Sequence, residues 1–185
     1  MTTPTNLIHY AIFAEQTLEG ETVEMRPGMP HRFFNVIEAG ADCPFIKRDA
    51  ENFERIHLEP GTYRINGVSF LTMIPPGSVE EPAPPIDVNG LTNIYPGYCV
   101  LYDVNKLPLP TLTDMSSCIC LGTMATAYDT SPSTFDCVHV VTDKCTISLG
   151  HQCGYKKDTL DHKVYLRLGG SNYHVAARIA IFKIA

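Results

Sequence analysis

The sequence predicts an all-β protein built as a β-sandwich. No apolar pattern with helical spacing persists for three turns, whereas short runs rich in β-branched and aromatic residues recur along the chain. The 13 glycines and 14 prolines interrupt the sequence often between these runs, as turns between strands do. About nine runs of this kind favour two packed sheets. The pattern alone leaves immunoglobulin-like, jelly-roll and barrel topologies open.

The predicted strands have the period-two alternation or the residue content that a pleated, half-buried surface favours. We expect them to form one domain that covers residues 31–185. In chain order they are Phe33–Ile37, Phe53–Leu58, Thr62–Met73, Gly97–Val104, Cys118–Ala125, Thr134–Val141, Cys145–His151, Lys163–Leu168 and His174–Ile184.

The clearest of these elements follows a Pro-Gly turn. Pro60 restricts φ to the value that the second turn position needs, and Gly61 tolerates the positive φ that follows. Alternation then predicts one face of the strand to carry Tyr63, Ile65, Gly67, Ser69 and Leu71, and the other face to carry Arg64, Asn66, Val68 and Phe70.

Two segments differ from the strands. Residues 1–30 contain one apolar run, Leu7–Phe13, and are predicted to form an N-terminal arm that serves as a docking segment. Residues 74–90 hold five prolines, which remove backbone donors and favour extended polyproline conformation. We expect this stretch to be a long surface loop between two strands.

Composition excludes several classes of protein. The net charge is −6 and the basic residues are scattered, so nucleic-acid binding is not expected. No apolar run is long enough to cross a membrane. The first ten residues lack the pattern of a signal peptide. The odd number of cysteines, seven, is then most simply explained by reduced thiols.

Metal sites and catalytic sites are weakly indicated. Cys118 with Cys120 and His151 with Cys153 have strand spacing that could present two ligands on one face, but core packing is the favoured interpretation. There is no His-x-His pair, nucleophile elbow, phosphate loop or zinc-protease motif. Glu80 and Glu81 fall in the proline-rich segment, and His139 is expected on a polar or subunit-facing side of its strand. We therefore predict no catalytic residue, no metal and no cofactor.

Ile56–Leu71, IHLEPGTYRINGVSFL, resembles the LPAGTYRI element of C1q/TNF-like jelly-roll domains in bacteriophage tail-fibre and head-fibre proteins. Further elements of that family have similar counterparts in the same order. The segments are Tyr98–Val104 (ending in LYDV), Cys120–Tyr128 (similar to LLLGTSEY), Ile147–Cys153 (similar to LELQHRC) and Ile179–Lys183 (an aromatic and then a basic residue). The chain departs from the family in its proline-rich insertion at 74–90 and in having no tryptophan, and residues 1–30 have no counterpart.

The resemblance implies a jelly-roll sandwich that assembles as a homotrimer, with the last strand bordering the three-fold axis. The sequence of that strand suits such a role, because the face opposite its apolar core side carries small residues and one aromatic residue in place of the polar residues of a solvated face. The predicted trimer-interface residues are His174, Ala176, Arg178, Ala180 and Phe182.

The resemblance also implies a function. The expectation is a non-enzymatic phage virion structural protein, namely a tail-fibre, tail-tip or head-fibre knob. It would be made in the host cytoplasm, join other virion proteins through residues 1–30 and attach to host-surface glycans. The sequence offers no ligand-binding residue for the last role. The alternative is a free-standing trimeric carbohydrate-binding protein of bacterial origin.

Overall fold

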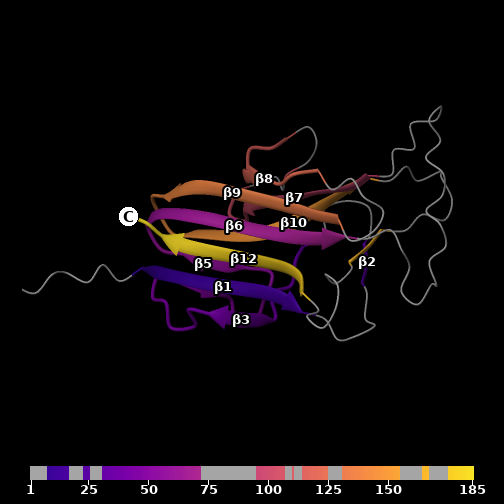
Figure 1. Cartoon of the computed structure of the whole chain (residues 1–185). Coiled ribbons are helices and arrows are strands. Elements are labelled where there is room, and N and C mark those ends of the chain that lie inside the picture. The colour runs from indigo at the N-terminus through magenta and orange to yellow at the C-terminus, as the bar shows by residue number, and fades with distance from the viewer. Residues whose placement is uncertain are drawn as a thin grey trace, which may run out of the picture.

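The computed structural model describes residues 8–16, 23–25, 31–71, 95–106, 110, 114–124, 131–154, 164–166 and 175–185. These residues form two five-stranded antiparallel sheets and a two-stranded ribbon, and they contain no helix (Figure 1). The two sheets lie face to face, which is the layered arrangement of a β-sandwich. The predicted fold class is confirmed.

The first sheet has the strand order β3-β1-β12-β6-β9. Figure 1 shows its strands side by side across the front of the molecule. Their bounds are β3 (Val36–Ala39), β1 (His9–Gln16), β12 (Val175–Lys183), β6 (Gly61–Leu71) and β9 (Ser131–Val141).

The second sheet has the order β4-β5-β10-β7-β8, and the ribbon pairs β2 with β11. Apart from β4–β5 and β7–β8, neighbouring strands are not consecutive in sequence, so most of the pairing is non-local. The bounds are β4 (Ile46–Arg48), β5 (Ile56–Leu58), β10 (Cys145–Gly154), β7 (Tyr95–Asp103), β8 (Cys118–Leu121), β2 (Val23–Met25) and β11 (Val164–Leu166).

The core lies between the sheets and follows the predicted alternation. On β6, Tyr63, Ile65 and Ser69 are fully buried, whereas Arg64 is exposed. On β12, Ala177, Ile179 and Ile181 face the same core. Because side chains alternate along a strand, one register fixes the inner and outer sets for the whole sheet.

The predicted arm requires a correction. Within residues 1–30, His9–Gln16 form β1, which pairs with β12 on one side and with β3 on the other. Ala11 and Phe13 of this strand belong to the core. The apolar run at Leu7–Phe13 is therefore a sheet strand, since its alternate residues fill the sandwich, and the domain extends at least to His9.

Other boundaries differ in detail. Phe33–Asn35 are not in a strand, and β4 was not predicted, because three residues give too short a pattern to recognise. The turn before β6 has the predicted positive φ at Gly61, 156°. The proline-rich segment at 74–90 lies outside the described residues, as does His174.

Candidate functional site

The candidate site is the outer face of the first sheet, on the side away from the core. The register places Tyr10, Phe182, Arg64 and Val138 in one row across β1, β12, β6 and β9. The next row holds Ile12, Ala180, Asn66 and Asp136. Side chains opposite one another on a sheet are in reach of each other, so these rows form one continuous surface.

Several large apolar side chains are exposed on this face. Tyr10 is 41% exposed, and Val138 and Val140 are 63% and 61% exposed. Phe182 is half-buried and stacks on Tyr10, with 6.0 Å between the ring centroids. A shallow hollow of about 270 Å³ beside Ala180 is lined by Asn66, Gly67, Val68, Phe135, Arg178 and Ala180. Apolar residues gathered on one face are typical of an association surface.

The charges on the face are paired within the chain. Arg178 Nε donates to Glu38 Oε2 at 2.6 Å, across from β12 to β3. Arg64 donates to both carboxylate oxygens of Asp136, at 3.1 and 2.6 Å. The side-chain hydrogen bond to Arg64 holds the pKa of Asp136 below its usual value. The carboxylate partner of Arg178 is therefore Glu38 of the same chain.

The second sheet has a different outer face. Val100, Tyr102 and Ser148 point away from the core, yet they are fully buried. The segment before β3 covers part of this face, where His31 forms a bridge with Gly150 and its ring lies edge-on to Tyr102. Near this face Asp103 N also donates to Ser117 O at 2.9 Å. The centre of this outer face is thus covered, although Leu121, which pairs with Val100, is exposed at its edge.

Of the predicted interface residues, His174 lies outside the described residues and Ala176 is not on the exposed surface. Arg178, Ala180 and Phe182 lie on the outer face, with Arg178 exposed and the other two half-buried. Ala176 is fully buried within the single chain, so it offers no surface to a partner. The pairing of β1 with β12 shifts register between Glu15 and Gln16, opposite this residue, and such an irregularity breaks simple alternation.

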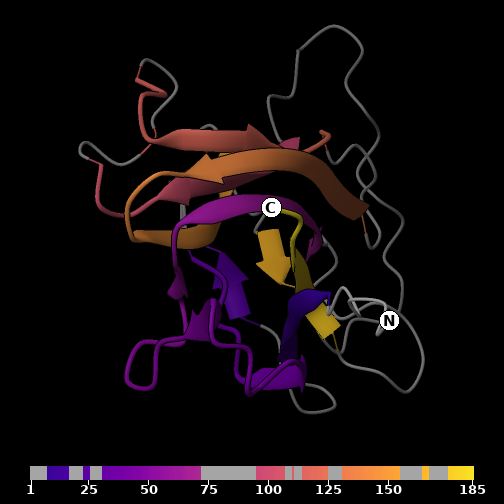
Figure 2. The same cartoon turned by 90° about the vertical axis from the view of Figure 1, so that its left-hand side faces the viewer.

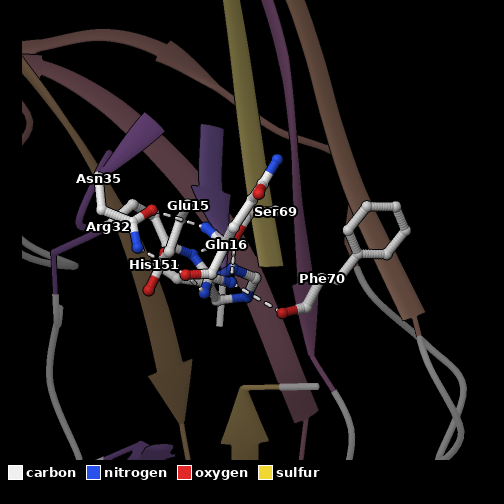
Figure 3. Close-up of polar contacts among 7 residues, drawn as sticks. All are labelled: Glu15, Gln16, Arg32, Asn35, Ser69, Phe70 and His151. Carbon is white, nitrogen blue, oxygen red and sulfur yellow. Dashed lines mark hydrogen bonds and ion pairs between the residues drawn. The ribbon is translucent and has the colours of Figure 1, made fainter. Parts of the chain in front are cut away.

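A second polar arrangement is buried between the sheets (Figure 3). Arg32, which is fully buried, donates from Nε and Nη2 to Ser69 Oγ at 2.8 and 2.6 Å, and from Nη2 to Phe70 O at 2.8 Å. Its Nη1 lies 3.5 Å from Glu15 Oε2. Ser69 Oγ is 2.7 Å from His151 Nδ1 on β10. The network therefore connects β1 and β6 of one sheet to β10 of the other.

The hydrogen bonds of the network assign its donors and acceptors. Because the Ser69 oxygen accepts two guanidinium N–H groups, its own proton donates to His151 Nδ1, which is therefore the unprotonated ring nitrogen. A serine hydrogen-bonded to a histidine is also the arrangement of an activated nucleophile, but Ser69, His151 and Arg32 are all fully buried. Burial raises the pKa of Glu15, and the nearby Arg32 charge opposes that rise.

The cysteines are free thiols at the six positions whose side chains are described. Cys118 and Cys120 do not follow the simple alternation that we expected. A register shift pairs Cys118 with Tyr102 but Cys120 with Leu101, and these two residues of β7 face opposite ways. Among the described residues, no group of three or more His, Cys, Asp or Glu side chains could hold a metal ion. The Cys153 side chain lies outside the described part.

His139 also requires a correction. It lies on β9 between Cys137 and Val141, on the inner side of the strand, and Val138 and Val140 point outward. Burial and the Lys106 charge lower its pKa, whereas Asp103 raises it. The outward position predicted for His139 is therefore taken by the two valines. In the part of the chain that the structure describes, no helix has the length and apolar character to cross a bilayer.

The fold defines a class of protein, the TNF-like jelly rolls. No family model and no curated relative matches the chain. Among solved structures, the TNF protein Eiger from S. frugiperda has a similar fold, with a TM-score of 0.52 over 96% of this chain and 93% of that chain. The two are 8% identical, so the likeness concerns the fold alone. It confirms the TNF-like jelly-roll prediction.

Proposed function

We propose that the protein is a non-enzymatic structural knob of a bacteriophage particle, located on a tail fibre, tail tip or head fibre, and that it works as a homotrimer. The observation that carries the assembly is the contrast between the two outer faces. Val100, Tyr102 and Ser148 on the outer face of the second sheet are buried by the chain itself, whereas Tyr10, Val138 and Val140 are exposed on the first sheet. Paired charges on that face lower the cost of removing it from water.

The particle role is supported by the five sequence elements that resemble phage fibre domains, in the same order, together with the TNF-like fold. Because His9–Gln16 belong to the sheet, we assign the docking role to the other residues of the segment 1–30. A trimer presents three copies of any loop at fixed spacing, which multiplies weak contacts with a surface. Host-surface glycans are the proposed target of those contacts.

The particle role is tested by labelling. Antibodies against the purified protein should decorate one defined site on particles from the source of the gene, and the gene should lie among tail or head genes. A gene far from any particle genes, with no labelled particle, would favour the alternative, a free-standing bacterial carbohydrate-binding protein.

The attachment role is tested on a glycan array. The wild-type protein should bind a defined set of glycans, and Ala180→Arg, designed to be monomeric, should bind the same set about 100-fold more weakly because avidity is lost. Ala50→Arg adds the same side chain at an exposed position outside the sheets and should bind as the wild type does. A trimer that binds no glycan would contradict this part of the proposal.

A further inference from the structure

The sandwich has an open edge where its two sheets end side by side. β9 is the edge strand of the first sheet and β8 is the edge strand of the second; Figure 2 shows them next to each other at the top of the molecule. Each strand contributes a half-buried cysteine to this edge, Cys120 from β8 and Cys137 from β9.

The backbone joins the two edges close to these cysteines. Just beyond β8, Thr123 N donates to Thr134 O of β9 at 2.9 Å, and Thr134 N donates to Thr123 Oγ1 at 3.0 Å. The two segments run in opposite directions. Cys120 lies three residues before Thr123, and Cys137 lies three residues after Thr134.

Both thiols also point inward. In its own sheet Cys120 pairs with Leu101, and Cys137 pairs with Ile65. Leu101 and Ile65 are fully buried in the shared core, and both cysteines pack against that core from its rim. Paired residues of antiparallel strands point to the same side, so the two sulfurs approach each other between the sheets.

The ionisation of Cys137 reflects this closeness. Burial raises its pKa to about 12, and the neighbouring Cys120 thiol adds to the rise, partly through a side-chain hydrogen bond. Cys137 is therefore a poor attacking thiolate at neutral pH.

We propose that Cys120 and Cys137 form a disulfide under oxidising conditions, which clamps the open edge of the sandwich. The oxidant is a small-molecule disulfide. The Cys120 thiolate attacks one of its sulfurs and releases one thiolate; Cys137 then loses its proton and attacks Cys120 in the mixed disulfide, which releases the second thiol. The net change is two protein thiols and one disulfide converted into one protein disulfide and two small thiols.

The clamp goes beyond the proposed function and does not depend on the oligomeric state. It suits a protein that folds with reduced thiols and later works in oxidising surroundings, because the bridge would add a covalent link between two edge strands that belong to different sheets.

The experiment exposes the folded full-length chain to oxidised glutathione and then blocks free thiols. Cys118, Cys120 and Cys137 lie between Lys106 and Lys144 with no Lys or Arg between them, so trypsin yields them in one peptide. Cleavage at Tyr128 by chymotrypsin then separates Cys137 from Cys118 and Cys120. The wild type and Cys118→Ser should show the two chymotryptic pieces joined, and Cys120→Ser and Cys137→Ser should not.

Thermal melting provides the second readout. Oxidation should raise Tm by about 5 °C or more in the wild type and in Cys118→Ser. It should leave the Tm of Cys120→Ser and Cys137→Ser unchanged. A bridge from Cys118, a stable mixed disulfide with glutathione, or joined pieces without a rise in Tm would overturn the proposal. If a serine variant does not fold, the peptide map of Cys118→Ser decides, because it leaves Cys120 and Cys137 as the only edge pair.

Discussion

At the scale of single residues, the buried Arg32 is the most consequential side chain of the structure. It contacts Ser69, the carbonyl of Phe70 and Glu15, and it lies at the end of the sandwich where β1 and β6 finish (Figure 3). A guanidinium cannot lose its charge in a protein interior. Its partners therefore have to supply all the compensation that water would give.

Replacing Arg32 by Met should destabilise the fold by about 3–5 kcal/mol, because Glu15 and Ser69 would be left buried without their donor. The double variant Arg32→Met with Glu15→Gln should recover part of this loss, since no unpaired charge remains. Urea unfolding of the three proteins measures the effect. An Arg32→Met protein within about 0.5 kcal/mol of the wild type would show that the network contributes little.

The raised pKa of Glu15 predicts that the stability of the fold depends on pH. Its pKa in the folded protein is raised above the usual 4.5, with burial as the largest cause, Arg32 opposing it and Glu54 adding to it. A raised pKa means that the contribution of Glu15 to stability is complete below about pH 4.5 and is lost as the pH rises through the folded-state pKa. Relative to Glu15→Gln, the unfolding free energy of the wild type should therefore fall between pH 4 and pH 8.

The measurement is the denaturation midpoint of both proteins across that range. Subtracting the variant from the wild type removes the other titrating groups. A difference that grows with rising pH would mean that the ion pair with Arg32 outweighs the burial of the carboxylate, contrary to this account.

At this scale the sequence correctly placed Tyr63, Ile65 and Ser69 on one face of β6, because strand alternation needs no knowledge of partners. It did not reveal Arg32 or Glu15. A buried charge is defined by what surrounds it, and the partners of Arg32 come from β1 and β6, 17 to 38 residues away in the chain. Its own segment, before β3, shows no periodic pattern.

At the scale of elements, the approach of β3 to β1 depends on one glycine. Gly40 follows β3 with a φ of +72°, and a Cβ built on it would lie 2.0 Å from Tyr10 O. Both the left-handed backbone and the close contact exclude a side chain. The turn therefore fixes the edge of the first sheet.

Gly40→Ala should cost about 3 kcal/mol, from backbone strain together with displacement of β1. The neighbouring Ala41 is exposed, and Ala41→Ser should change stability by less than about 0.5 kcal/mol. Thermal or urea unfolding compares the two. Equal stabilities for both variants would mean that the edge of the sheet adjusts freely.

The strands that sequence analysis assigned wrongly were missed for a shared physical reason. β1 was assigned to an arm because polar, unmatched residues surround it, and only its pairing with β12 and β3 reveals it as a strand of the sheet. Cys118 and Cys120 were assigned to one face because alternation assumes a regular strand, whereas the pairing of β8 with β7 is irregular there. Short or irregular strands are defined by tertiary pairing rather than by local pattern.

At the scale of the whole molecule, the sequence was sufficient to predict the class of fold. Alternating strands and frequent turns predicted a sandwich, and the ordered resemblance of five segments selected the jelly roll among three topologies. Strand order could not come from alternation alone, because β1 lies next to β12 at the other end of the chain.

The composition of the outer face of the first sheet was predicted in part. The apolar outer face of β12 was visible in its sequence, but the contributions of β1 and β9 were not, since Tyr10 and Val138 join Phe182 only through the sheet register. The burial of Ala176 and the pairing of Arg178 with Glu38 also depend on neighbours that lie far away in the sequence.

The central claim is that the outer face of the first sheet holds three chains together, and sedimentation equilibrium at micromolar concentration tests it most directly. The wild type and Ala50→Arg should sediment with three times the chain mass of 20.5 kDa. Ala180→Arg should weaken assembly by about 100-fold or more, because it brings charges together in a surface that association must desolvate. A wild-type protein that sediments as a monomer, or an Ala180→Arg protein that remains a trimer as stable as the wild type, would contradict the claim.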